Sequence, residues 1–104
     1  MSILDNILFE LILQRTNSDK SCNYYVKLKK ECKLGEFIKE WLRDEKQYGV
    51  FVIEDTNFSA KFKNGEYTQT PFPKYLLSNK VQKVTVKRAF GDSTVIIKLK
   101  SANK

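Results

Sequence analysis

The hydrophobic positions of this chain follow two different periods. Between Leu34 and Gln47 they recur every three or four residues, which is typical of an amphipathic helix with one apolar stripe. Gly49 follows this segment and is expected to stop the helix. Most of the other apolar stretches alternate with polar residues, as in strands with one buried face. The pattern therefore predicts one helix lying across a sheet.

The last two strands are predicted from a turn and from matching alternation. A two-residue turn at Gly91-Asp92 separates strands at 81–89 and 94–100. In that register Lys83 faces Lys100, and the apolar residues of both strands share one face. We therefore expect an antiparallel pair at the end of the chain.

A second hairpin is predicted around Asn64-Gly65, the strongest short turn signal in the chain. Before it, Val50 to Ile53 is apolar at every position, as expected for a central strand. After it, the prolines on either side of Phe72 end regular pairing and start a loop to about Asn79.

The segment before residue 14 fits two patterns. Alternation at Ile7, Phe9, Leu11 and Leu13 predicts a strand that pairs with residues 24–28. A helix is the alternative, and its apolar face would hold Leu4, Ile7, Leu8, Leu11 and Ile12. We favour the strand because the helix would leave Phe9 and Leu13 on its polar side.

These elements predict a single α+β domain over residues 1–104. It has a mainly antiparallel sheet of about five to six strands with one amphipathic helix packed across one face, in the order β-β-α-β-β-β-β. A hairpin followed by one helix laid across the sheet, then more strands, resembles the opening of a β-grasp (ubiquitin-like) domain. The resemblance is one of element order over about Ile7 to Ile53, and it implies no function, because such scaffolds host many.

Composition bounds the compartment and the cofactors. The first residues carry no Lys or Arg, and Glu10 interrupts the first apolar stretch, so we expect neither a signal peptide nor a membrane partner. Cys22 and Cys32 lie on either side of a predicted strand, too far apart for a disulfide. Two thiols alone cannot complete a zinc site. We expect a cytoplasmic protein without metal or cofactor.

The chain contains no histidine, which removes the commonest general base and the Ser-His and Cys-His nucleophilic pairs. Glu54 and Asp55 are adjacent on a predicted strand, so their carboxylates would point to opposite faces. We therefore expect no catalytic residues. An enzyme built from Lys, Tyr and carboxylate chemistry is the remote alternative.

The formal charge of +7 is concentrated near the C-terminus, where residues 81–104 hold five Lys and one Arg against one Asp. The predicted hairpin places four lysines on its outward face as a candidate anion-binding or nucleic-acid-binding site: Lys83, Lys87, Lys98 and Lys100. Such a patch attracts phosphate with a steep salt dependence. A solvated sheet face is the alternative, and the use of Lys instead of Arg favours it.

Two further clusters are candidate contacts. Phe72 and Tyr75, in the proline loop, are candidate anchors for a protein partner, although both rings folding back onto the core is the favoured alternative. Tyr25 with Lys27 and Lys29 faces outward on a predicted strand and could stack on a base beside a phosphate. A β-forming residue on a solvated sheet face is the favoured alternative for that cluster.

The function predicted from these features is that of a small non-enzymatic intracellular binding module. We expect a protein-interaction, accessory or inhibitor domain of bacterial or mobile-element origin with a macromolecular partner. A protein partner is slightly favoured because no recognised nucleic-acid motif is present. Binding of a phosphate backbone by the C-terminal hairpin is the alternative.

Overall fold

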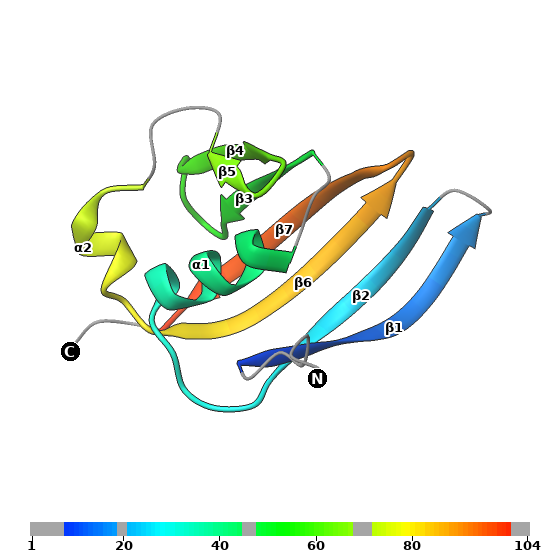
Figure 1. Ribbon diagram of the computed structural model, residues 1–104. Helices are drawn as coiled ribbons and strands as arrows, with labels where there is room; N and C mark the ends of the chain where they lie inside the picture. Colours follow the sequence, from blue (N-terminus) through cyan, green and yellow to red (C-terminus); the bar gives the residue numbers. More distant parts are fainter. Residues whose placement is uncertain (1–7, 19–20, 45–47, 68–71, 101–104) are drawn as a thin grey trace.

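One mixed sheet carries the architecture, and a helix lies across one of its faces (Figure 1). The computed structural model describes residues 8–18, 21–44, 48–67 and 72–100. Within them the elements are, in chain order, β1 (Phe9–Ser18), β2 (Ser21–Leu28), α1 (Leu34–Asp44), β3 (Gly49–Ile53), β4 (Ser59–Lys63), β5 (Glu66–Tyr67), α2 (Lys74–Leu77), β6 (Val81–Ala89) and β7 (Asp92–Leu99). The seven strands lie in the order β1-β2-β6-β7-β3-β4-β5.

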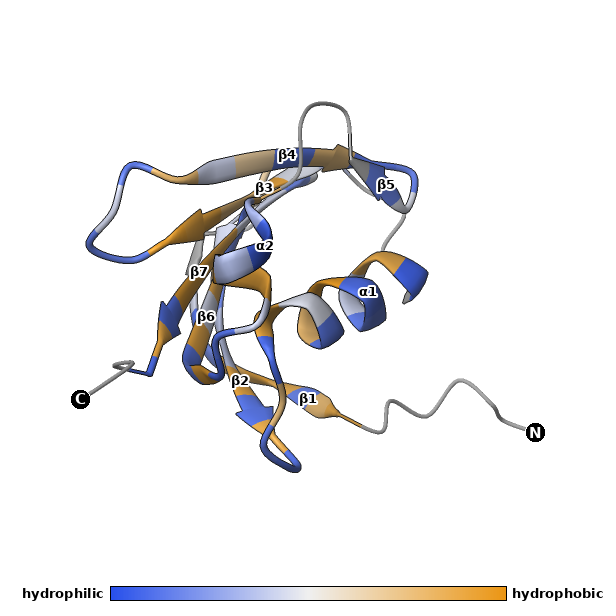
Figure 2. Cartoon of the chain, turned by 90° about the vertical axis from the view of Figure 1, so that its left-hand side faces the viewer, coloured by the Kyte–Doolittle hydropathy of each residue, from blue (hydrophilic) through white to orange (hydrophobic). Residues whose placement is uncertain are grey.

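The core lies between α1 and the sheet, as the apolar stripe of the helix requires (Figure 2). Phe37 and Trp41 project from α1 onto Phe9 of β1, with ring centroids 5.0 and 5.8 Å from that ring. At the other end of the sheet, Phe51 and Phe62 pack with centroids 4.5 Å apart. These side chains are almost fully buried, so one aromatic cluster joins α1 to β1 and a second joins β3 to β4.

The α+β class and the opening order of two strands, a helix and further strands follow the sequence-based expectation, whereas five strands and a second helix, not four strands alone, come after α1 in the described part of the chain. The sheet is larger and less uniform than expected. It has seven strands in the described residues, not five or six, and β3 runs parallel to β7 while every other neighbouring pair is antiparallel. The parallel pair arises because the chain returns from β5 through α2 and β6 to place β7 beside β3.

The N-terminal segment is a strand from Phe9 onward, so the helical alternative is wrong for the described residues. Leu11 pairs with Val26 and Leu13 with Tyr24, as the alternation predicted. The strand continues to Ser18, which shortens the expected loop. Ile7 and the residues before it lie outside the described residues.

The last hairpin turns one residue earlier than expected. Phe90 and Gly91 form the turn, with φ of 52° and 86°, and Ala89 pairs with Asp92. The register therefore shifts by two residues, and Lys83 faces Lys98 where Lys100 was expected. Because side chains alternate with a period of two, the shift leaves each residue on the face expected for it.

The expected loop after Phe72 contains a second helix, α2, which begins directly after Pro73. Proline suits the start of a helix because it lacks only an N–H that would have no intrahelical partner. The helix of four residues buries Leu76 against the core, and its Leu77 lies next to Gly35 of α1. One turn is too short to produce a helical period in the sequence.

In the part of the chain that the structure describes, no helix is long and apolar enough to cross a membrane.

Candidate functional site

The sheet has two unlike faces. One carries α1 and the core, and we call the other the open face. The open face consists of the strand residues that alternate with the buried ones, and none of the described helices lies on it (Figure 2). Its side chains are therefore the largest continuous set available to a partner on one side of the described sheet.

A transverse row of side chains crosses the middle of the open face. Strand pairing places Ile12, Tyr25, Thr85, Ile96 and Val52 side by side, in that order, from β1 to β3. We call these five residues the central row. Ile12 is 39% and Tyr25 36% exposed, and the other three are half-buried. The row is apolar except for the hydroxyl groups of Tyr25 and Thr85.

Lysines border the central row on both of its long sides. Lys27, Lys83 and Lys98 lie on one side, and Lys87 and Lys61 on the other. All five are exposed. Glu10, opposite Lys27, and Glu54, which follows β3, are the acidic residues at the ends of the first side. The open face thus combines a half-exposed apolar centre with a charged border.

Three of the four predicted anion-binding lysines, Lys83, Lys87 and Lys98, lie exposed in this border. Lys83 and Lys98 are directly opposed across β6 and β7. Like charges directly opposed across two strands destabilise a sheet slightly, so the charges of this pair do not stabilise the fold. An anionic group placed between these two ammonium groups would remove the repulsion.

The fourth predicted lysine, Lys100, is engaged elsewhere. Its Nζ lies 2.8 Å from one carboxylate oxygen of Glu31, and Lys80 Nζ lies 3.1 Å from the other. Hydrogen bonds from these two ammonium groups hold the pKa of Glu31 below its usual value. The charge of Lys100 is therefore compensated by the Glu31 carboxylate, whereas the hairpin pattern alone predicted an anion-binding lysine at this position.

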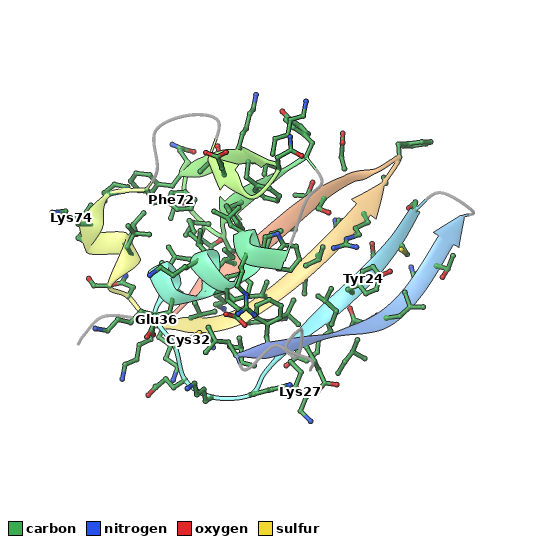
Figure 3. All side chains as sticks on the ribbon, in the orientation of Figure 1. Tyr24, Lys27, Cys32, Glu36, Phe72 and Lys74 are labelled. Carbon is green, nitrogen blue, oxygen red and sulfur yellow. The ribbon has the colours of Figure 1, made fainter. Side chains whose placement is uncertain are left out.

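The two residues predicted as anchors of a protein partner are separated by the structure. Phe72 is 5% exposed and belongs to the core, close to the start of α2, so its ring is not available as a surface anchor (Figure 3). Tyr75 is 63% exposed, and its ring packs edge-on against Phe58 with centroids 6.4 Å apart. The core-capping alternative is confirmed for Phe72 and not for Tyr75.

On the helix side of the sheet, Arg88 lies among aromatic rings. Its guanidinium carbon is 5.6 Å from the ring centroid of Tyr24 and 6.0 Å from that of Trp41, both within cation–π range. Cys22 Sγ and the Tyr24 hydroxyl lie within hydrogen-bond distance, 3.4 Å apart, and this contact together with burial raises the pKa of Tyr24. This arginine therefore adds no charge to the open face.

A shallow hollow of about 630 Å³ lies at the start of α1. Its lining alternates acidic and basic side chains: Lys30, Glu31, Lys33, Glu36, Lys39 and Glu40, with Leu8, Gly35 and Leu77. Cys32 lies close by (Figure 3). It is 3% exposed, and burial, reinforced by the neighbouring glutamates, raises the pKa of its thiol. A raised pKa disfavours the thiolate that a nucleophile requires.

The sequence alone predicted the outward orientation of only some residues of the open face. Tyr25 and Ile96 were correctly predicted to face outward. Val52 was assigned to a strand buried on both faces, whereas its outward side is half exposed. Because β3 lies next to β7 only in the folded sheet, no local signal places Val52 beside Ile96.

Comparison with known proteins finds no matching family model, no matching curated protein and no matching solved structure. The resemblance to β-grasp domains accordingly remains one of element order.

Proposed function

We propose that this chain is a small non-enzymatic binding module that docks an acidic protein surface on its open face. The observation that carries the proposal is the central row with its lysine border. Protein interfaces typically have an apolar, desolvated centre surrounded by a polar rim. The open face has this arrangement, and the sign of its border calls for a partner rich in Asp and Glu.

The composition of the central row favours a protein over a nucleic acid. Single-stranded nucleic acids bind to sheets by stacking bases on several aromatic rings, and Tyr25 is the row's one aromatic residue. Ile12, Ile96 and Val52 offer aliphatic surface, which packs against protein side chains and does not stack with bases. The lysines also lack the planar fork with which arginine reads base edges.

A role as an intracellular accessory or inhibitor domain of a bacterium or mobile element belongs to the same proposal. The absence of histidine from these 104 residues suits a module that acts by occupying a surface. A lysine count of sixteen against three arginines is consistent with an AT-rich coding sequence.

The proposal is tested by capture of partners from the organism that encodes the chain. Tyr25→Glu combined with Ile96→Glu places two carboxylates in the central row, facing an acidic partner. Truncation of a central contact costs roughly 2 kcal/mol or more, so we expect at least about a 30-fold loss of affinity. Tyr75→Glu is the matched control, because it adds a carboxylate at another exposed ring. Thermal melting checks that every variant is folded.

The proposal requires a protein retained by the wild type and by Tyr75→Glu but lost with the double variant. Retention by the double variant contradicts it. Titration with mixed-sequence DNA and RNA at 50 and 200 mM salt tests the nucleic-acid alternative. Salt-sensitive binding that Lys83→Glu with Lys98→Glu weakens would assign the open face to phosphate instead.

A further inference from the structure

The two edges of the sheet differ in a way that points to a partner for one of them. At one edge, β5 is two residues long and begins with Glu66. At the other, β1 is ten residues long. Soluble proteins protect long edge strands with lysine, proline or a covering element, because an open edge pairs with other strands. Within β1, residues 9–13 contain neither lysine nor proline.

Exposed apolar side chains of β1 lie on both faces of the strand. Leu11 is 37%, Ile12 39% and Leu13 54% exposed. Ile12 lies on the open face, while Leu11 and Leu13 lie on the helix side, where β1 and β2 continue past the end of α1 (Figure 1). Three consecutive apolar residues exposed at a sheet edge are typical of a strand that is paired in the functional state.

The backbone groups of Leu11 and Leu13 point toward the edge of the sheet. The Lys29 N–H donates to the Leu8 carbonyl over 2.7 Å, so Leu8 directs its backbone groups toward β2. Backbone directions alternate along a strand, and the N–H and C=O groups of Leu11 and Leu13 therefore point away from β2. On that side, no described residue bonds to them.

Two charged residues define which strand complements this edge. A bulge between Leu13 and Arg15 lets Arg15 pair with Asn23, which puts Arg15 on the open face with Glu10 and Ile12. Counting pairing positions across the bulge, Glu10 lies two positions before Ile12 and Arg15 two positions after it. The edge is thus complementary to itself about Ile12.

We propose that β1 pairs with β1 of a second copy of this chain, antiparallel and centred on Ile12. Ile12 then faces Ile12 of the second copy, Leu11 faces Leu13 twice, and Glu10 faces Arg15 twice. Leu11 and Leu13 exchange four backbone hydrogen bonds across the two-fold axis, as hydrogen-bonded antiparallel pairs do. Two sheets become one, and their central rows meet end to end at Ile12.

A second copy is favoured over an unrelated strand because the charges are self-complementary. The attraction between the Glu10 carboxylate and the Arg15 guanidinium of the second copy stabilises the antiparallel register centred on Ile12 and no other nearby register. In the register centred on Leu11, Glu10 would face Ile12 and Arg15 would have no acidic partner. The pairing is independent of the open-face partner and is measured without it.

Cross-linking tests the register. Directly opposed residues of a non-hydrogen-bonded antiparallel pair have Cα atoms about 4.5 Å apart, inside the range that a disulfide spans. Ile12→Cys, in a Cys22→Ser background, is expected to form a disulfide-linked dimer under mild oxidation. Leu13→Cys is the matched control because it faces Leu11, and we expect its cross-linking to be at least tenfold slower. Equal rates for the two variants overturn the register.

Charge exchange provides a second test that needs no oxidation. Glu10→Arg and Arg15→Glu each oppose like charges twice, so each should weaken the dimer about tenfold in sedimentation equilibrium. Glu10→Arg combined with Arg15→Glu restores the opposite charges and should restore the dimer, with thermal melting confirming that all three variants fold. A wild-type chain that remains monomeric at about 0.5 mM overturns the proposal, as does failure of the double variant to recover.

Discussion

Replacing Gly49 by alanine tests the parallel junction between β3 and β7, which positions Val52 in the central row. A Cβ atom added at Gly49 would lie 2.5 Å from the Ser93 carbonyl oxygen and would also overlap Cζ of Phe62. Neither neighbour can retreat easily. The pairing of β7 with β3 holds the backbone of Ser93, and the fully buried Phe62 ring packs on Phe51.

The cost follows from the two overlaps. Overpacking a close-packed core costs typically 1–3 kcal/mol, and because one overlapping atom is backbone we expect about 3 kcal/mol for Gly49→Ala. For a domain of this size that corresponds to a melting temperature lower by roughly 12–24 °C. Differential scanning calorimetry and urea unfolding measure it. The strands on either side of the junction would have to separate to accommodate the methyl group.

Gly35→Ala is the matched control, because the same methyl group there meets Leu77 at ordinary contact distances of 3.4 Å and more. Gly35 lies in α1, where alanine is favoured over glycine by up to about 1 kcal/mol. We expect unchanged or increased stability. A Gly49→Ala variant within about 0.5 kcal/mol of the wild type would refute the described packing of β3 against β7.

Three further predictions concern single residues. Glu31 has a lowered pKa in the folded state, so its stabilising effect is present at neutral pH and is lost as the pH falls through that pKa. Glu31→Gln should therefore reduce the difference between the urea midpoints measured at pH 7 and at pH 3. An unchanged difference would contradict the pairing of Glu31 with lysine. Cys32 is buried with a raised pKa, so iodoacetamide should modify Cys22 first in the native chain, as read by peptide mass spectrometry; equal rates would show that Cys32 is accessible. Phe90 is 78% exposed at φ 52°, so Phe90→Asn, which creates an Asn-Gly turn, should raise stability by about 1 kcal/mol in thermal melts, whereas a lower melting temperature would contradict the turn geometry.

Alternation along the strands was enough to assign many side chains to one face of the sheet or the other. It correctly placed Tyr24 inward and Lys27 outward (Figure 3). It also placed Tyr25 outward, because side-chain direction depends only on the local period. The same argument could not fix the register of the last hairpin. A shift by two residues preserves every face, so the hydrophobic pattern is identical in both registers.

Turn propensity then selected the wrong register, because the observed turn holds Phe90 in a left-handed conformation that glycine and asparagine prefer. The sequence likewise contains no sign that Gly49 is buried between strands. A glycine after a helical segment reads as a helix stop, whereas here it also begins β3 and allows close approach to Ser93. Contacts between strands distant in sequence decide both features, and these contacts are not encoded locally.

In the candidate site too, local alternation predicted some features, and others depend on contacts between residues distant in sequence. Lys83, Lys87 and Lys98 could be assigned to one exposed face from the sequence, since that assignment needs only alternation. The engagement of Lys100 with Glu31, 69 residues earlier in the chain, required the fold. Predicting the burial of Phe72 also required the fold, because nothing in the Pro-Phe-Pro segment indicates which ring faces inward.

Site-specific photo-cross-linking tests docking on the open face most directly. A benzophenone side chain placed at position 96, in the middle of the central row, is compared with one at the exposed position 39 on α1, and both are irradiated in cells of the organism that encodes the chain. Our account predicts a covalent adduct with an acidic protein from position 96 and none from position 39. Adducts from position 39 alone, or equal adducts from both positions, would contradict it.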